Sequence, residues 1–121
     1  MLSLIMLFGL ITVAQAQAPA PSAARAAELG PGEGAAFAMT NTARNNLIIT
    51  YRRAADGTLT RVGSISTRGT DIGVDLDTQG GLRLSNDDRF LSAANAGSDD
   101  ITVFAVSGTE LTFVQRVFAG E

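Results

Sequence analysis

Cysteine, histidine and lysine are all absent from this chain of 121 residues. Without cysteine there is no disulfide, no thiol nucleophile and no cysteine metal site. Without histidine, the most frequent general base and metal ligand is missing, so no serine has the base partner of a hydrolytic triad. Without lysine no Schiff base forms. These absences exclude several kinds of catalytic site from the chain.

Positive charge is also sparse. Nine arginines stand against twelve aspartates and glutamates, which gives a formal net charge of -3. The arginines are scattered, and residues 52–53 are the only adjacent pair. A nucleic-acid partner would require a basic stripe or patch, so we expect none.

The first residues have the pattern of an export signal. Residues 2–13 are apolar, and Ala-Gln-Ala at residues 14–16 matches a signal-peptidase site. The run is shorter than the about twenty residues that cross a bilayer. We therefore predict a signal peptide at residues 1–16 and a periplasmic or secreted product with no membrane association after cleavage; the alternative is an apolar tail. Residues 17–34, rich in Ala, Pro and Gly, are predicted to be a linker.

Residues 35–121 contain one pattern of short apolar segments twice. The matched positions are the pairs Phe37–Leu91, Tyr51–Phe104 and Val62–Val114, so the offset shrinks by one at each loop. A repeat of about fifty residues built from short strands is typical of the blades of a β-propeller. We predict seven strands and no helix, at residues 35–41, 46–53, 58–67, 81–85, 89–95, 100–106 and 110–118.

The predicted fold class is therefore all-β, with about two blades of a β-propeller. The first blade covers residues 35–67 and the second residues 81–118. The middle strands are apolar on both faces, so each needs cover on both sides. Two blades cannot close a ring, so we expect an open fragment of a seven-bladed ring, inactive by itself. Its exposed strand edges favour self-association.

Two segments carry a resemblance to a known family. Residues 79–91 (Gln-Gly-Gly-Leu-Arg-Leu-Ser-Asn-Asp-Asp-Arg-Phe-Leu) and 94–104 (Ala-Asn-Ala-Gly-Ser-Asp-Asp-Ile-Thr-Val-Phe) resemble the lactonase family of seven-bladed propellers, which includes 6-phosphogluconolactonase-like and 3-carboxymuconate-cyclase-like proteins. The resemblance implies that the first blade lacks its innermost strand, which would come from the far C-terminus of a complete chain. It also implies that the catalytic residues proposed for cyclase-type relatives lie in later blades, so no catalytic residue is assigned here. Asp88 stands where the family has glycine, at a position expected to need positive φ.

The family's central channel suggests a ligand site. By this analogy a polar pocket is lined by residues of the connection between the two blades and of the strand that follows it. They are Asp71, Asp75, Asp77, Gln79 and Arg83. The alternative is a solvated loop, with Arg83 paired to a nearby aspartate. Residues 75–80 imitate a calcium loop, but its twelfth position is Asn86 instead of glutamate, so we predict no metal. No cofactor is expected.

The remaining polar motifs favour turns. Asn41 and Asn95 recur at matched positions, which indicates a turn role through bonds to the backbone. The pairs at residues 87–88 and 99–100 are predicted to be solvated turn carboxylates.

Two functions remain open. The first is an exported lactonase-like propeller that opens or isomerises a lactone, with a small lactone or sugar acid as its partner. The alternative is a non-catalytic exported propeller that acts as a binding module.

Overall fold

The computed structural model describes residues 28–74 and 80–120, and all regular structure within them is β. The strands are β1 (Gly34–Met39), β2 (Leu47–Arg53), β3 (Leu59–Ser66), β4 (Leu82–Leu84), β5 (Phe90–Asn95), β6 (Asp100–Ser107) and β7 (Glu110–Phe118). They confirm the seven predicted strands to within two residues at each end. No helix in the described part of the chain is long and apolar enough to cross a membrane. The predicted signal peptide and most of the predicted linker lie outside the described residues.

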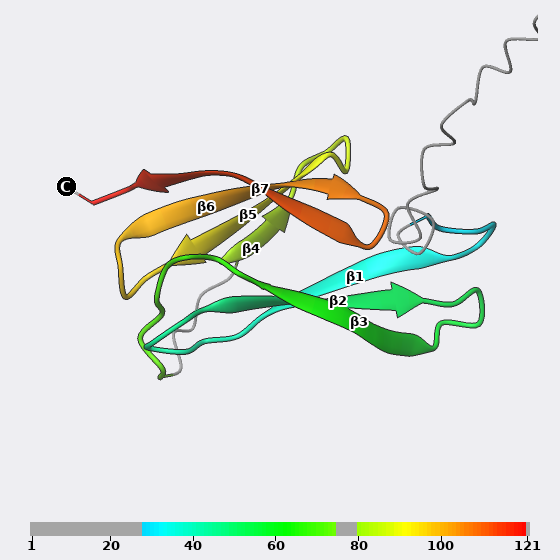
Figure 1. The fold of residues 1–121 in the computed structure, drawn as a ribbon, viewed down its shortest axis with the longest axis horizontal. Helices are drawn as coiled ribbons and strands as arrows, with labels where there is room; N and C mark the ends of the chain where they lie inside the picture. Colours follow the sequence, from blue (N-terminus) through cyan, green and yellow to red (C-terminus); the bar gives the residue numbers. More distant parts are fainter. Residues whose placement is uncertain (1–27, 75–79, 121) are drawn as a thin grey trace, which may run out of the picture.

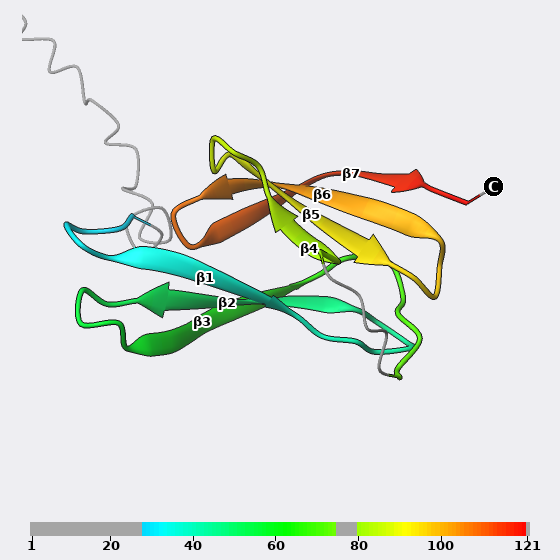
Figure 2. The same cartoon turned by 180° about the vertical axis from the view of Figure 1, so that it is seen from behind.

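The strands form two antiparallel sheets, each a simple up-and-down meander. The first sheet has the order β1-β2-β3 and the second the order β4-β5-β6-β7. The two sheets lie face to face, as Figures 1 and 2 show from opposite sides. The turn before β3 uses an Asp-Gly pair: the backbone N–H of Thr58 donates to Asp56 Oδ1 over 2.9 Å, and Gly57 has a φ of 90°. Glycine is favoured there because most other residues adopt a φ of this size only at a cost.

A β-bulge occurs at the same place in both sheets. In the first sheet Thr50 pairs with Gly63 but the next residue pairs with Arg61, so Val62 is the extra residue. In the second sheet the register slips after Val103, and Val114 is the extra residue. The bulges therefore match Val62 with Val114, as the sequence repeat does, and show that β1, β2 and β3 correspond to β5, β6 and β7. Among the described residues the first sheet has no strand that corresponds to β4, as the family resemblance implied.

The pairing also corrects one detail of the sequence alignment. Thr50 and Val103 occupy matched positions, because each directly precedes the register shift of its sheet. Thr50 pairs with Phe37, and Val103 pairs with Ser92. Phe37 therefore corresponds to Ser92, and the alignment of Phe37 with Leu91 was wrong. The cause is the loop between β1 and β2, which is two residues longer than the loop between β5 and β6. Because neighbouring residues of a strand point to opposite faces, this shift of one residue decides which face each side chain belongs to.

A small apolar core fills the space between the sheets. Its buried members are Ile48 from the first sheet and Leu91, Ala93, Phe104 and Leu111 from the second. Phe104 also meets Phe113 edge to face, with ring centroids 6.3 Å apart. The outer strands β3 and β7 are mostly exposed, as their polar sequences predicted. The core thus stabilises the contact of one sheet with the other.

Candidate functional site

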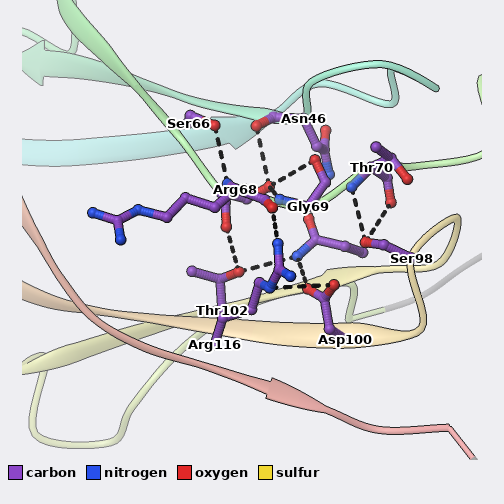
Figure 3. Close-up of polar contacts among 11 residues, drawn as sticks. Asn46, Ser66, Arg68, Gly69, Thr70, Ser98, Asp100, Thr102 and Arg116 are labelled. Atoms are coloured by element: carbon purple, nitrogen blue, oxygen red, sulfur yellow. Dashed lines mark hydrogen bonds and ion pairs between the residues drawn. The ribbon is translucent and has the colours of Figure 1, made fainter.

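Beside the apolar core, buried polar side chains join the two sheets near the ends where β2 and β6 begin (Figure 3). We call this group the inter-sheet polar cluster. Its members, all at most 5% exposed, are Asn46, Thr67, Asp71, Asn95, Asp100 and Thr102. Burying polar groups is tolerated only when each has a hydrogen-bond partner. No buried side-chain nitrogen or oxygen of the described residues lacks one.

Asn95 is the centre of the inter-sheet polar cluster. Its Nδ2 donates to Asp100 Oδ1 over 2.7 Å and to Thr102 Oγ1 over 3.0 Å. Its Oδ1 accepts a hydrogen bond of 3.2 Å from Asn46 Nδ2. Asn46 Nδ2 also lies 3.3 Å from Asp71 Oδ2. The side chain of Asn95 therefore connects the second sheet to the residue that leads into β2 of the first.

The chain segment that leaves β3 lies against the second sheet and completes the inter-sheet polar cluster. The Thr102 hydroxyl donates to the carbonyl oxygen of Thr67 over 2.6 Å. The backbone N–H of Thr70 donates to Ser98 Oγ over 2.9 Å, and that of Gly97 donates to the Thr70 carbonyl over 3.0 Å. The fit leaves no room for a side chain, because a Cβ on Gly97 would lie 2.5 Å from the carbonyl oxygen of Asp71.

Two arginines close the cluster on its exposed side. Arg68 has a φ of 64°, and its guanidinium lies 3.5 Å from the ring centroid of Phe113. Its carbonyl oxygen accepts a hydrogen bond from Arg116 Nη1. Arg116 Nε also lies 3.6 Å from Asp100 Oδ2. The buried carboxylate of Asp100 thus has a charged partner and an amide donor, which offset the cost of removing it from water.

Asp71, one of the predicted ligand residues, belongs to the inter-sheet polar cluster. Its side chain is 3% exposed. One carboxylate oxygen accepts from Asn46 and the other from the backbone N–H of Ile72, over 3.0 Å. The backbone N–H of Asp71 donates to the Thr42 carbonyl over 2.8 Å. These contacts tie Asp71 to the loop between β1 and β2.

Arg83, the other predicted residue that the structure describes, lies elsewhere. It is exposed on β4 and pairs with Ser92, on the face of the second sheet that points away from the first sheet. It lines an open hollow of about 360 Å³, together with Leu84, Ser85, Asn86 and Ser92. Asp71 and Arg83 are therefore on opposite sides of the second sheet and are not brought together. Asp75, Asp77 and Gln79 lie outside the described residues.

The two places differ in what they can do chemically. In the inter-sheet polar cluster every buried side-chain nitrogen and oxygen has a hydrogen-bond partner within the chain, which is the arrangement of a structural contact. The hollow beside Arg83 presents a guanidinium with hydroxyl and amide neighbours, a combination suited to a carboxylate or phosphate group. Within residues 28–74 and 80–120, no three acidic residues lie close enough together to hold a metal ion.

Two interpretations of turn residues were tested by the structure. Asn41 does bind the backbone: its Oδ1 accepts from Gly73 N over 3.2 Å, and its Nδ2 donates to the Val74 carbonyl. The same prediction was wrong for Asn95, whose side chain bonds to the side chains of Asn46, Asp100 and Thr102. The expectation that Asp100 is a solvated turn residue was wrong, because it is the first residue of β6 and only 5% exposed. Its companion Asp99 is exposed, with a φ of 53°. The sequence did contain a signal for the burial of Asp100: it is two residues from Thr102, so in a strand both side chains point to the same face.

Asp88 behaves as its place in the sequence predicted. It is exposed, with a φ of 57°, in the turn between β4 and β5. Aspartate tolerates this left-handed conformation better than most residues.

The paired meanders, the matched bulges and the face-to-face contact are those of neighbouring propeller blades. A family model described as lactonase, 7-bladed beta-propeller, matches residues 8–121. The chain belongs to this lactonase family. The first and second sheets are thus two blades of the lactonase propeller, and they do not close a ring. No curated protein and no solved structure matches the chain.

Proposed function

We propose that this chain forms two blades of an exported lactonase-type propeller that binds a lactone or its sugar acid and opens or isomerises the lactone ring when the propeller is complete. The family match supports the propeller, and the pattern of residues 1–16 supports export. The lactone chemistry would be of the 6-phosphogluconolactonase-like or 3-carboxymuconate-cyclase-like kind. The observation that carries the binding role is the exposed guanidinium of Arg83 in an open hollow.

Arg83 would anchor the anionic end of the ligand. Opening a lactone places negative charge on the ester carbonyl and leaves a carboxylate, and preorganised donors lower the barrier. The residues that line the hollow of Arg83 supply such donors in Ser85, Asn86 and Ser92, but none of them is a carboxylate that could serve as base. These two blades would therefore bind and orient the ligand, and the base would come from another part of the ring.

The test is an NMR titration of the full chain with gluconate, whose carboxylate Arg83 would bind, and with the neutral glucono-δ-lactone for comparison; hydrolysis is measured separately. We expect gluconate binding that weakens at least five-fold in Arg83→Gln and is unchanged in Arg61→Gln, a matched exposed arginine on β3. If a complete propeller that contains these two blades binds the lactone but does not hydrolyse or isomerise it, the non-catalytic binding module is favoured. Equal affinity of wild type and Arg83→Gln would refute the role of Arg83.

Export has its own test. The N-terminus of the product recovered from outside the cytoplasm should be Gln17 if cleavage follows Ala16. An intact N-terminus on that product would contradict the assignment of residues 1–16 as a cleaved signal.

A further inference from the structure

The turn between β2 and β3 contains the only Asp-Gly pair of the chain, at residues 56–57. Both residues are exposed, and a Cβ built on Gly57 would meet nothing within 4 Å. Because glycine has no side chain, its backbone nitrogen is open to approach by the side chain of Asp56. The turn follows directly on the pair of Arg53 and Leu59, so its conformation is set within a single sheet.

An Asp-Gly pair carries an intramolecular reaction whose only co-reactant is water. The Gly57 nitrogen attacks Cγ of the protonated Asp56 carboxyl, a C–N bond forms, and the N–H proton leaves with the carboxyl hydroxyl as one water molecule. Water then adds to either carbonyl carbon of the resulting succinimide and breaks a C–N bond. One cleavage restores aspartate, and the other gives isoaspartate, in which the main chain runs through Cβ. No atom is oxidised or reduced, and the mass of the chain is unchanged.

The folded turn engages both reacting groups in other bonds. The Gly57 N–H donates to the carbonyl oxygen of Ala54 over 2.9 Å, and Asp56 Oδ1 accepts from the Thr58 N–H over 2.9 Å. The Ala54 N–H donates to the Thr58 carbonyl oxygen over 2.8 Å and closes the turn. The Thr58 N–H is also the largest cause that lowers the pKa of Asp56, so it favours the carboxylate over the protonated form that reacts. The attack therefore requires these bonds to break.

The end of the β2–β3 hairpin has little apolar packing to keep it closed. The first six residues of β3 are exposed, and Leu59, the partner of Arg53, is 53% exposed. Exposed ends of this kind open locally at a small cost in free energy. One opening would release the Gly57 nitrogen and the Asp56 carboxyl together, because the bonds of the same turn restrain both.

We propose that Asp56 is a modification site at which isoaspartate forms when the end of the β2–β3 hairpin opens, and that the bonds to Ala54 and Thr58 suppress the reaction in the closed turn. The rate then follows the population of the open hairpin, since opening and closing are fast relative to the chemistry. The extra main-chain carbon would disturb the pairing of Arg53 with Leu59, because turn geometry fixes the register of a hairpin. This inference does not use the lactone proposal.

Two other turns of the chain provide comparisons. The turn between β6 and β7, which corresponds to the one at Asp56, contains Gly108 with a φ of 58°, but serine precedes this glycine. Asp88 is an exposed turn aspartate, but the residue that follows it is Arg89, whose side chain hinders attack by its own backbone nitrogen. Modification should therefore occur at Asp56 and spare Asp88.

The test is incubation of the full chain at neutral pH, followed by peptide mapping with electron-transfer fragmentation, which distinguishes isoaspartate from aspartate. Unfolding in urea should raise the rate at Asp56 about ten-fold over the folded chain, because the turn is then always open. Asp56→Glu is the chemical control and should give no such product, since the attack would have to close a larger ring. Asp88 should stay unmodified in the same samples.

Thr58→Pro tests the restraint itself, because proline lacks the N–H that bonds to Asp56. We expect modification of the folded variant to be about three-fold faster, the effect of losing one exposed hydrogen bond. Circular dichroism establishes that the variant stays folded, and if it does not, the comparison of folded and unfolded wild type decides. Absence of isoaspartate from the unfolded chain, or equal rates in the folded and unfolded chains, would overturn the proposal. An unchanged rate in folded Thr58→Pro would overturn the role of Thr58. Lactone binding is measured separately, so either proposal can fail without the other.

Discussion

Asn46, which leads into the first sheet, donates a hydrogen bond of 3.2 Å to Oδ1 of Asn95 on the second, across 49 positions of sequence. Both side chains are buried, at 0% and 1% exposed. A neighbouring bond between Thr102 and the Thr67 carbonyl spans 35 positions. The two blades of this lactonase-family chain are therefore joined by specific polar contacts as well as by apolar burial.

Asn95→Ala should lower the free energy of unfolding by about 3 kcal/mol, since it removes one buried hydrogen-bond partner from each of Asn46, Asp100 and Thr102. Urea denaturation followed by circular dichroism measures the change. The matched control is Asn41→Ala, which removes an asparagine from an exposed loop and should cost about 1 kcal/mol or less. Equal effects of the two substitutions would show that the inter-sheet polar cluster contributes no more than an ordinary loop contact.

Gly97→Ala should destabilise the fold by about 1–3 kcal/mol, because the new methyl group collides with the Asp71 carbonyl and neither partner is a flexible side chain. Gly63→Ala is the control, since a Cβ there meets nothing within 4 Å. That substitution should be neutral or stabilise by about 0.5 kcal/mol through the unfolded state. Thermal denaturation of both variants tests the difference. A Gly97→Ala protein as stable as Gly63→Ala would contradict the close contact between Gly97 and the Asp71 carbonyl.

Asp88→Gly should raise the free energy of unfolding by about 0.5 kcal/mol, because glycine adopts the observed φ of 57° without strain. Asp88→Val should lower it by about 1–2 kcal/mol, since a β-branched residue is strongly disfavoured there. The two changes in opposite directions, measured by urea denaturation, separate backbone strain from loss of the carboxylate. If both variants lose the same stability, the carboxylate matters and the strain does not.

Asp87 should titrate at a lower pH than an ordinary aspartate. The Ser85 hydroxyl donates to its Oδ1 over 2.7 Å and the Arg89 N–H over 3.3 Å, and these bonds lower the pKa of Asp87. A lowered pKa in the folded state means a stabilisation that is present above the unfolded-state pKa and is lost as pH falls through the folded-state value.

The measurement is a carboxyl-carbon NMR titration of Asp87. Ser85→Ala should raise the pKa of Asp87 toward that of an ordinary aspartate, because it removes the hydroxyl hydrogen bond that lowers this pKa most. Ser92→Ala, on the neighbouring strand, is the control and should leave it unchanged. A pKa that does not respond to Ser85→Ala would rule out the hydroxyl as its cause.

The strands could be predicted from the sequence because their signals are local. Asp-Gly at residues 56–57 and the polar residues before β6 mark turns whatever surrounds them, and apolar runs fill the strands between. The side-chain faces could not be predicted, because they depend on a hairpin that is two residues longer and on bulges at Val62 and Val114. A slip of one residue leaves a sequence pattern almost unchanged and reverses every face.

The candidate site was less predictable for a related reason. Asn95 and Asp100 have the residue types of a turn, and only the segment of residues 67–71, which arrives from the other sheet, makes them buried. The sequence also grouped Asp71 with Arg83 because they flank one connection. Arg83 lies on the face of the second sheet that points away from the first, whereas Asp71 belongs to the inter-sheet polar cluster, so nearness in sequence did not become nearness in space.

The long sequence separations within the inter-sheet polar cluster set the order of events in folding. Contacts within each hairpin close short loops, whereas the bond between Asn46 and Asn95 spans 49 positions and costs more chain entropy. We expect the hairpins to form first and the sheets to dock after the rate-limiting barrier. Asn95→Ala should then accelerate unfolding and leave the refolding rate nearly unchanged in stopped-flow experiments. The chain would owe its lifetime in the folded state, more than its speed of folding, to the contact between its two blades.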